Sequence, residues 1–233
     1  MKGKEIKREH TVKGKSRAAA LLLGVAALCS IAPATAQADE YWDRKTSLFE
    51  VLPVRSTDIV FLGNSITDGG EFTELFGMPN ILNRGISSDV ITGVEKRLTQ
   101  VTAGQPAKIF LLIGINDVSH NLTVDQLANR YERLVKKIRE QSPKTKLYVQ
   151  SVMPVNNTFR RYKNLIGKEK TITELNKRIR TIALDNGATW LDLWPCLDDG
   201  TGKLKKGYTN DGLHLNGAGY KAWARGIERY VKE

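Results

Sequence analysis

A chain of 233 residues, 41% of them hydrophobic, is long enough to bury the core of one domain. Its formal net charge is +11, but the lysines and arginines are spread along the chain, without an arginine-rich tract or a basic stripe interleaved with aromatic residues. Composition therefore argues against a nucleic-acid-binding protein, whereas an anionic substrate or surface remains compatible with it.

Residues 1–38 have the order of a secretory signal peptide. Basic residues precede an apolar segment from Ala18 to about Ala32, and Ala-x-Ala sites follow at Ala34-Thr35-Ala36 and Ala36-Gln37-Ala38. The apolar part has roughly 15 residues, fewer than the roughly 20 that span a bilayer. We therefore predict cleavage and release over the alternative, a permanent anchor. The protein is then exported to the periplasm or the cell exterior, with no stable membrane insertion.

Cleavage leaves a single predicted domain over residues 39–233. The first 36 residues carry seven Lys/Arg and two Glu, which accounts for five of the eleven net positive charges and leaves the rest mildly basic. Cys196 is then the only cysteine, so no intramolecular disulfide is expected. No Cys/His cluster has zinc spacing, and we predict neither a metal nor an organic cofactor. Only His120 and His214 remain to shuttle protons near neutral pH.

Short apolar runs alternate with amphipathic stretches along this domain. Three runs, 58–62, 108–113 and 146–152, are near-continuous and rich in β-branched and aromatic residues, which is typical of strands covered on both faces, as in a parallel sheet. Two weaker runs at 81–83 and 189–193 are also predicted as strands.

Helical patterns fill the intervals between these runs. Thr123 with Gln126 predicts a capping box, and Asn186-Gly187 predicts a helix end. Strands that alternate with helices indicate βαβ units and a three-layer α/β sandwich. In chain order the predicted helices are a short aromatic one near 41–52, a weaker one at 88–99, two amphipathic ones at 124–138 and 172–183, and a last one from about Asn216.

Ligands of such open parallel sheets bind outside the carboxyl ends of the strands. The first strand runs directly into Gly63-Asn64-Ser65, where a tight turn can present the serine hydroxyl. Gly-Asn-Ser is also a common turn composition, so this motif alone is weak evidence. It is not a phosphate-binding loop, because no Gly-Lys-Ser/Thr follows at the required spacing.

Asp211-Gly212-Leu213-His214, just before the last helix, offers the partners that a nucleophilic serine needs. An imidazole takes the serine proton, and a carboxylate orients the imidazole. Three residues of separation on a loop allow Asp211 to reach the ring nitrogen that faces away from the serine. The alternative is a helix-entry loop with a solvated Asp211 and a packed His214.

Two further loops after strands carry potential donors for a developing oxyanion. Gly85 lacks a Cβ, so that its backbone N–H can approach a substrate closely, and Asn116 follows the most hydrophobic strand. The alternative role of Asn116 is that of a turn or cap residue.

Together these segments resemble the sequence blocks of the SGNH/GDSL hydrolases, and residues 83–98 are similar to the subgroup related to platelet-activating-factor acetylhydrolase. The resemblance extends from about Asp58 to Trp223. It implies a five-stranded parallel sheet in flavodoxin-like order and a serine hydrolase activity. One departure is Asn64, where the family usually has Asp. The implied site residues are the triad Ser65, His214 and Asp211, with an oxyanion hole made by the backbone N–H groups of Ser65 and Gly85 and the side chain of Asn116.

Other serine, cysteine and carboxylate enzymes fit the sequence less well. An ordinary α/β-hydrolase needs G-x-S-x-G, but Thr67 stands in place of the second glycine. His120 has no carboxylate at useful spacing and is predicted to lie in a loop at the site rim. Cys196 has no adjacent histidine. Asp117 and Asp192 do not form an obvious glycosidase pair.

The sequence thus predicts an esterase that removes short acyl groups, chiefly acetyl, from extracellular carbohydrate or a small-molecule ester. No long apolar lid is present for a fatty chain. A lysophospholipase or acyl-thioesterase is the alternative among enzymes, and a non-catalytic glycan-binding module on the same fold is the alternative of another class. The oligomeric state is not predicted. Phe72, Phe76, Trp194 and Tyr208 could stack on sugars at the mouth of the site, or they could equally belong to the core, which is the commoner place for such residues.

Overall fold

Five parallel strands form one sheet in the order β2-β1-β3-β4-β5 in the computed structural model, which describes residues 34–233. This is the flavodoxin-like order. All five predicted strands are confirmed, and each predicted strand end lies within two residues of the observed one. The strands are β1 Ile59–Gly63, β2 Ile81–Gly85, β3 Lys108–Leu112, β4 Lys146–Gln150 and β5 Thr189–Leu191.

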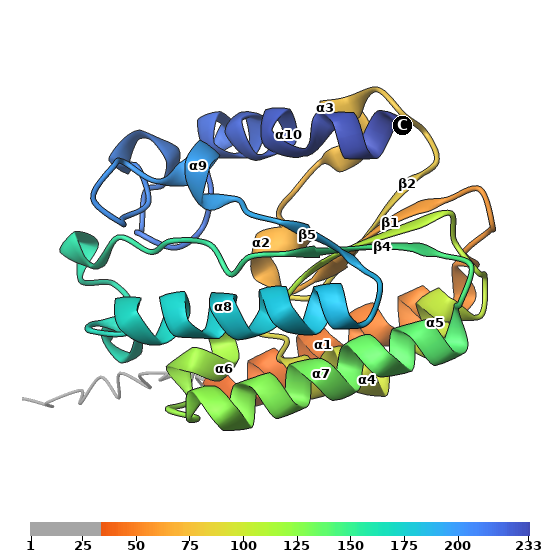
Figure 1. Cartoon of the computed structure of the whole chain (residues 1–233), viewed down its shortest axis with the longest axis horizontal. Helices are drawn as coiled ribbons and strands as arrows, with labels where there is room; N and C mark the ends of the chain where they lie inside the picture. The colour runs from red at the N-terminus through yellow and green to blue at the C-terminus, as the bar shows by residue number, and fades with distance from the viewer. Residues whose placement is uncertain (1–33) are drawn as a thin grey trace, which may run out of the picture. The chain divides into compact units, whose positions relative to one another are not determined.

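Helices cover both faces of the sheet, which gives the predicted three layers (Figure 1). One face is covered by α10 (Gly217–Lys232), with the short helices α3 (Phe72–Phe76) and α9 (Trp194–Leu197) beside it. The opposite layer contains α1 (Ala34–Val51), α4 (Ile91–Lys96), α5 (Thr99–Thr102), α7 (Val124–Gln141) and α8 (Glu169–Asp185). The remaining elements are α2 (Ser65–Asp68), α6 (Ile115–Ser119) and the 3₁₀ turns Asn157–Phe159, Lys163–Leu165 and Lys206–Tyr208.

Two of the long helices, α7 and α10, begin at a residue whose side chain bonds free backbone N–H groups of the first turn. The predicted capping box is present at the start of α7, where Thr123 and Gln126 bond each other's backbone N–H groups. The side chain of Asn216 accepts two N–H groups at the start of α10. The helix predicted over 88–99 is different, because it begins only at Ile91 and breaks at Arg97. Ser88 has a φ of 66°, which is incompatible with a right-handed helix.

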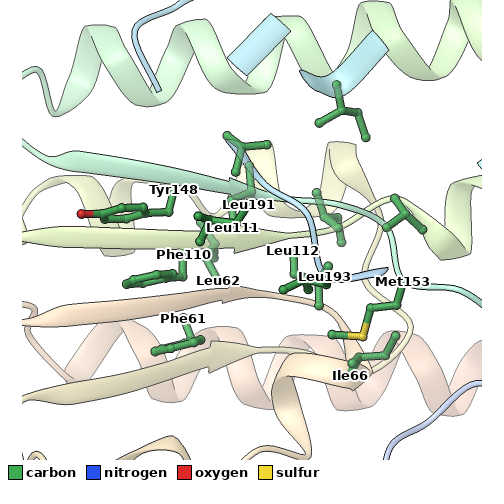
Figure 2. Packing of buried hydrophobic residues seen from close by; sticks show 14 of the residues in the cluster. Phe61, Leu62, Ile66, Phe110, Leu111, Leu112, Tyr148, Met153, Leu191 and Leu193 are labelled. Carbon is green, nitrogen blue, oxygen red and sulfur yellow. The ribbon is translucent and has the colours of Figure 1, made fainter. Parts of the chain in front are cut away.

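A row of stacked rings crosses the middle of the sheet. Phe61 of β1, Phe110 of β3 and Tyr148 of β4 are register partners, with ring centroids 4.9 Å and 4.5 Å apart (Figure 2). Such cross-strand aromatic pairs stabilise a sheet beyond the burial of their area. Phe61 also stacks on Phe72 of α3 at 4.0 Å, so the same row ties the sheet to the α10 layer. The carboxyl ends of β1 and β3 are therefore held at one level.

The predicted signal peptide falls mostly on residues 1–33, which lie outside the described part of the chain. Its last five residues belong to the first turns of α1. The aromatic helix predicted near 41–52 is the remainder of that helix. From residue 34 onwards, none of the helices combines the length and the apolar character required to cross a membrane.

Candidate active site

Ser65 lies two residues after the end of β1, at the carboxyl edge of the sheet. Asn64, which is 1% exposed, caps α2 by accepting the backbone N–H of Ile66 at 3.1 Å. The turn therefore forms with an amide at the position where the SGNH/GDSL hydrolases that the sequence resembles usually have Asp. Ser65 is the first residue of α2 and half-buried, so its backbone N–H has no acceptor within that helix.

The loop before α10 brings His214 and Asp211 to this serine. Oγ of Ser65 lies 2.9 Å from Nε2 of His214, and Nδ1 of His214 lies 2.8 Å from Oδ2 of Asp211. The other carboxylate oxygen of Asp211 accepts the backbone N–H groups of Leu213 and His214. The three side chains thus form one chain of hydrogen bonds across 149 residues of sequence separation.

These contacts determine the charge state of Asp211. Partial burial acts to raise the carboxyl pKa, but the hydrogen bonds from the His214 ring and from two backbone N–H groups hold the pKa of Asp211 well below its usual range. The side chain is therefore a carboxylate at neutral pH, which is the form that orients and stabilises an imidazolium.

Tyr162 is a site residue that sequence reasoning missed. Its hydroxyl donates to Oδ2 of Asp211 at 2.9 Å and lies 3.0 Å from Nδ1 of His214. Burial and the hydrogen bond to Asp211 raise the pKa of Tyr162 to about 12, so that the hydroxyl stays protonated and can donate. No motif marks this tyrosine, because it comes from the irregular segment between β4 and α8, 49 residues from Asp211 in sequence.

A cavity of about 560 Å³ opens over Ser65 and His214. Hydroxyls, amides and two cations dominate its lining, and no carboxylate belongs to it. The residues that line it are Ser65, Ser87, Ser88, Asn116, Ser119, Arg161, Tyr162, Lys163, Asn164, Leu165, Leu213 and His214.

Asn116 belongs to this lining, as predicted for an oxyanion donor. It lies at the start of α6, after β3, and its Nδ2 donates to the backbone oxygen of Asp89 at 2.9 Å. An amide nitrogen carries two hydrogens, so one remains for a substrate. The bond to Asp89 fixes the orientation of the amide.

Gly85 is not placed as the sequence predicted. Its backbone N–H donates to Oδ1 of Asn83 at 2.8 Å, and Gly85 is not part of the cavity lining. A Cβ at this position would lie 2.1 Å from the backbone nitrogen of Asp68. The glycine is therefore required for the close approach of α2 to the end of β2, and the prediction that its N–H holds an oxyanion is at odds with this geometry.

Ser87 and Ser88 occupy the place in the cavity that was predicted for Gly85. Ser88 is exposed and has the left-handed φ of 66°. Among the hydrogen bonds of residues 34–233, none engages the Ser88 backbone N–H, whereas the Ser87 N–H donates to Asp68. The left-handed conformation of a serine has no sequence signature, which is why the prediction chose the nearby glycine.

The other residues considered from sequence lie away from the cavity. His120 is exposed at the end of α6 and is not part of the lining. Phe72 and Phe76 are buried in the core, which is the second of the two alternatives, and Trp194 and Tyr208 do not line the cavity.

Two side chains weighed as alternative reactive groups have other surroundings. Burial raises the pKa of the Cys196 thiol, which disfavours the nucleophilic thiolate. Asp117 is fully buried and accepts the backbone N–H of Ile91. Within residues 34–233, no group of three or more potential metal ligands gathers.

A parallel sheet in flavodoxin-like order, with a serine and a histidine in hydrogen-bond contact at its carboxyl edge, defines the class of three-layer α/β hydrolases. The model of the GDSL-like lipase/acylhydrolase family matches residues 61–222, which is more than half of the chain. The chain therefore belongs to this family, in agreement with the resemblance found in its sequence, and it is a carboxylic-ester hydrolase.

Solved structures with the same fold include enzymes of this kind. A protein from Streptococcus pneumonia described as a platelet activating factor is 28% identical, with a TM-score of 0.74, over 84% of this chain and 94% of its own. A GDSL-like lipase from Bacteroides thetaiotaomicron is 23% identical, with a TM-score of 0.70, over 82% and 97%. An acetylxylan esterase from Geobacillus stearothermophilus is 18% identical, with a TM-score of 0.63, over 77% and 95%.

One curated relative differs in name from these hydrolases. An N-acylneuraminate cytidylyltransferase from Escherichia coli is 28% identical over 181 residues, which is 76% of this chain. The chain spans only 41% of the length of that relative.

Proposed function

We propose that this protein is a serine esterase that hydrolyses short acyl esters, chiefly acetyl esters, on carbohydrate outside the cytoplasm. The observation that carries the proposal is the chain of hydrogen bonds from Ser65 through His214 to Asp211, at 2.9 Å and 2.8 Å, on the floor of an open cavity. A serine hydroxyl becomes an effective nucleophile when a base in contact with it removes its proton.

In the proposed mechanism, Nε2 of His214 takes the Ser65 proton while Oγ attacks the ester carbonyl. His214 then protonates the leaving alcohol, and an acyl-enzyme remains. Water, deprotonated by the same ring, attacks the acyl group and releases the acid and free Ser65. Asp211 stabilises the imidazolium in both halves, and Tyr162 holds the Asp211 carboxylate in place.

The carbonyl oxygen that becomes negative needs hydrogen-bond donors. We assign them to the backbone N–H groups of Ser65 and Ser88 and to the second Nδ2 hydrogen of Asn116. Ser88 replaces Gly85 in this assignment, because Ser88 lines the cavity and its N–H is without an acceptor in the described chain. Donors aimed at a developing oxyanion contribute about 10²–10³ each in rate.

The cavity lining supports a small, polar substrate. Apart from the Tyr162 ring, only Leu165 and Leu213 offer apolar side chains to it, so a long fatty chain has little surface to bind. The curated relative is named for an N-acylated neuraminate, an acidic sugar, and an acetylxylan esterase shares the fold. Both names favour a carbohydrate as the alcohol portion. Export follows from the signal peptide predicted in the sequence.

Hydrolysis of p-nitrophenyl acetate, butyrate and octanoate by residues 39–233 and by Ser65→Ala tests the proposal. We expect activity that falls with acyl length and disappears in the variant. Activity that peaks at octanoate would instead indicate a lysophospholipase or acyl-thioesterase. Glycan binding without turnover of any of the three esters would indicate a non-catalytic module.

A further inference from the structure

Two cationic side chains line the cavity beside the serine. Arg161 and Lys163 flank Tyr162 in sequence, and both are exposed at the cavity wall. Neither forms an ion pair with a carboxylate of residues 34–233, whereas five other exposed cations of that range, Arg133, Lys136, Lys177, Arg178 and Lys232, do. Since no carboxylate lines the cavity, its wall presents two uncompensated positive charges.

The segment that carries these charges is held in place at its middle, by Tyr162, and at its end, by Leu165. Tyr162, between the two cations, bonds Asp211 and His214 at 2.9 Å and 3.0 Å. Leu165 is 2% exposed, and its backbone oxygen accepts Nδ2 of Asn157 at 2.9 Å. The backbone of Arg161 and Lys163 is therefore positioned relative to the nucleophile by the same contacts that order the triad.

We infer that Arg161 and Lys163 form a subsite for a carboxylate on the alcohol portion of the substrate, which makes the preferred substrate an acylated acidic sugar. The inference rests on the proposed function, because it concerns the same cavity. A guanidinium and an ammonium on one wall suit a planar carboxylate, which the guanidinium can bind through two parallel hydrogen bonds. A sugar acid fits better than an anionic lysophospholipid, because only two aliphatic side chains, Leu165 and Leu213, line the cavity and could contact a long acyl chain.

A matched pair of esters tests the subsite. O-acetylated glucuronic acid and O-acetylated glucuronamide have the same sugar and the same acetyl group, but only the first carries a charge. We expect kcat/KM for the acid to exceed that for the amide by about tenfold at low ionic strength, and the ratio to fall as salt screens the pair. In the double variant Arg161→Gln/Lys163→Gln we expect the ratio to fall close to one.

The control removes the same kind of charge elsewhere. Lys144 is exposed in the turn before β4, at the opposite edge of the sheet from Ser65. Lys144→Gln should keep the wild-type ratio of the two substrates. If Lys144→Gln lowers the ratio as much as the double variant does, the overall charge of the protein selects the acid, and the subsite is wrong.

The remaining outcomes separate the subsite from the proposed function. Equal kcat/KM for acid and amide in the wild type overturns the subsite and leaves the esterase intact. The same holds if p-nitrophenyl acetate is hydrolysed but neither sugar ester is, or if an anionic lysophospholipid is hydrolysed faster than both. Failure to hydrolyse even p-nitrophenyl acetate would overturn the esterase and the subsite together.

Discussion

The hydroxyl of Tyr41 in α1 donates to Oδ2 of Asp68 at 2.6 Å. The same carboxylate oxygen accepts the backbone N–H of Ser87 at 3.2 Å, and Lys45 pairs with the other oxygen at 2.9 Å. Trp42 of the same helix makes a second hydrogen bond of this kind, from its Nε1 to Oδ1 of Asp89 at 3.2 Å. Through these bonds α1 holds the loop that follows β2 against the cavity.

Tyr41→Phe should therefore affect catalysis from outside the cavity. Burial and the bond to Asp68 raise the pKa of Tyr41 to about 12, so the wild-type hydroxyl is a permanent donor. We expect the variant to lose about 1 kcal/mol of unfolding free energy and about threefold to tenfold in kcat, with KM little changed. Chemical denaturation and steady-state kinetics measure the two effects. A loss of stability without any change in kcat would restrict α1 to a structural role.

Tyr162→Phe tests the residue that orders the triad. The ring still fills its place against His214, but the donor to Asp211 is lost. A hydrogen bond to a charged group contributes about 1.5–3 kcal/mol, so we expect kcat to fall by roughly tenfold or more, while KM changes by less than about threefold. Tyr208→Phe is the control, because Tyr208 lies outside the cavity lining. Equal kcat values in wild type and Tyr162→Phe would show that the triad orders itself without the phenol.

Two substitutions of Ser88 distinguish the contribution of its backbone N–H to catalysis from that of its hydroxyl. Ser88→Gly keeps the N–H and adopts a positive φ without strain, so kcat should stay within about threefold of the wild type. Ser88→Val places a β-branched residue in the left-handed region, which costs about 1–2 kcal/mol, and the loop should shift, with a large loss of kcat. An inactive but stably folded Ser88→Gly would assign the role to the hydroxyl instead.

Gly85→Ala should act on folding. Its new Cβ would meet the backbone of Asp68, which no side-chain rotation can relieve. We expect the unfolding free energy to fall by about 1–3 kcal/mol, as in other overpacked cores. Gly207→Ala is the matched control, because no heavy atom lies within 4 Å of its Cβ position. Thermal and urea denaturation distinguish the two. A fully stable Gly85→Ala with low kcat would restore Gly85 as an oxyanion donor.

Asp211→Asn removes the charge of this carboxylate and should lower both the activity and the stability of the protein. We expect kcat to fall by about 10³ or more, as when other triads lose this carboxylate. Because the pKa of Asp211 is lower in the folded than in the unfolded chain, ionisation of this carboxyl stabilises the fold above the unfolded pKa of about 4. The stability advantage of wild type over the variant should therefore be complete at neutral pH and shrink as the pH falls below about 4. Urea unfolding at several pH values measures it, and a pH-independent difference would contradict this account.

Local sequence determined most of the fold. Near-continuous apolar runs predicted β1, β3 and β4, because strands buried on both faces cannot alternate polar and apolar residues, and weaker runs of the same kind predicted β2 and β5. The start of α7 was readable because Thr123 and Gln126 cap it with their own side chains. Ser65, Asn116 and His214 were found because each directly follows a strand or precedes a helix, and parallel strands bring their carboxyl ends to one edge.

Tertiary structure decided what local sequence could not encode. Whether Gly85 or Ser88 faces the cavity depends on the φ of 66° at Ser88, which the packing of α2, α4 and β2 imposes on a residue without intrinsic preference for it. Tyr162 reaches Asp211 only because the segment between β4 and α8 folds back over the carboxyl edge, and Tyr41 reaches Asp68 only because α1 packs there. Such contacts join residues far apart in sequence, and their geometry is determined by the packing of whole elements.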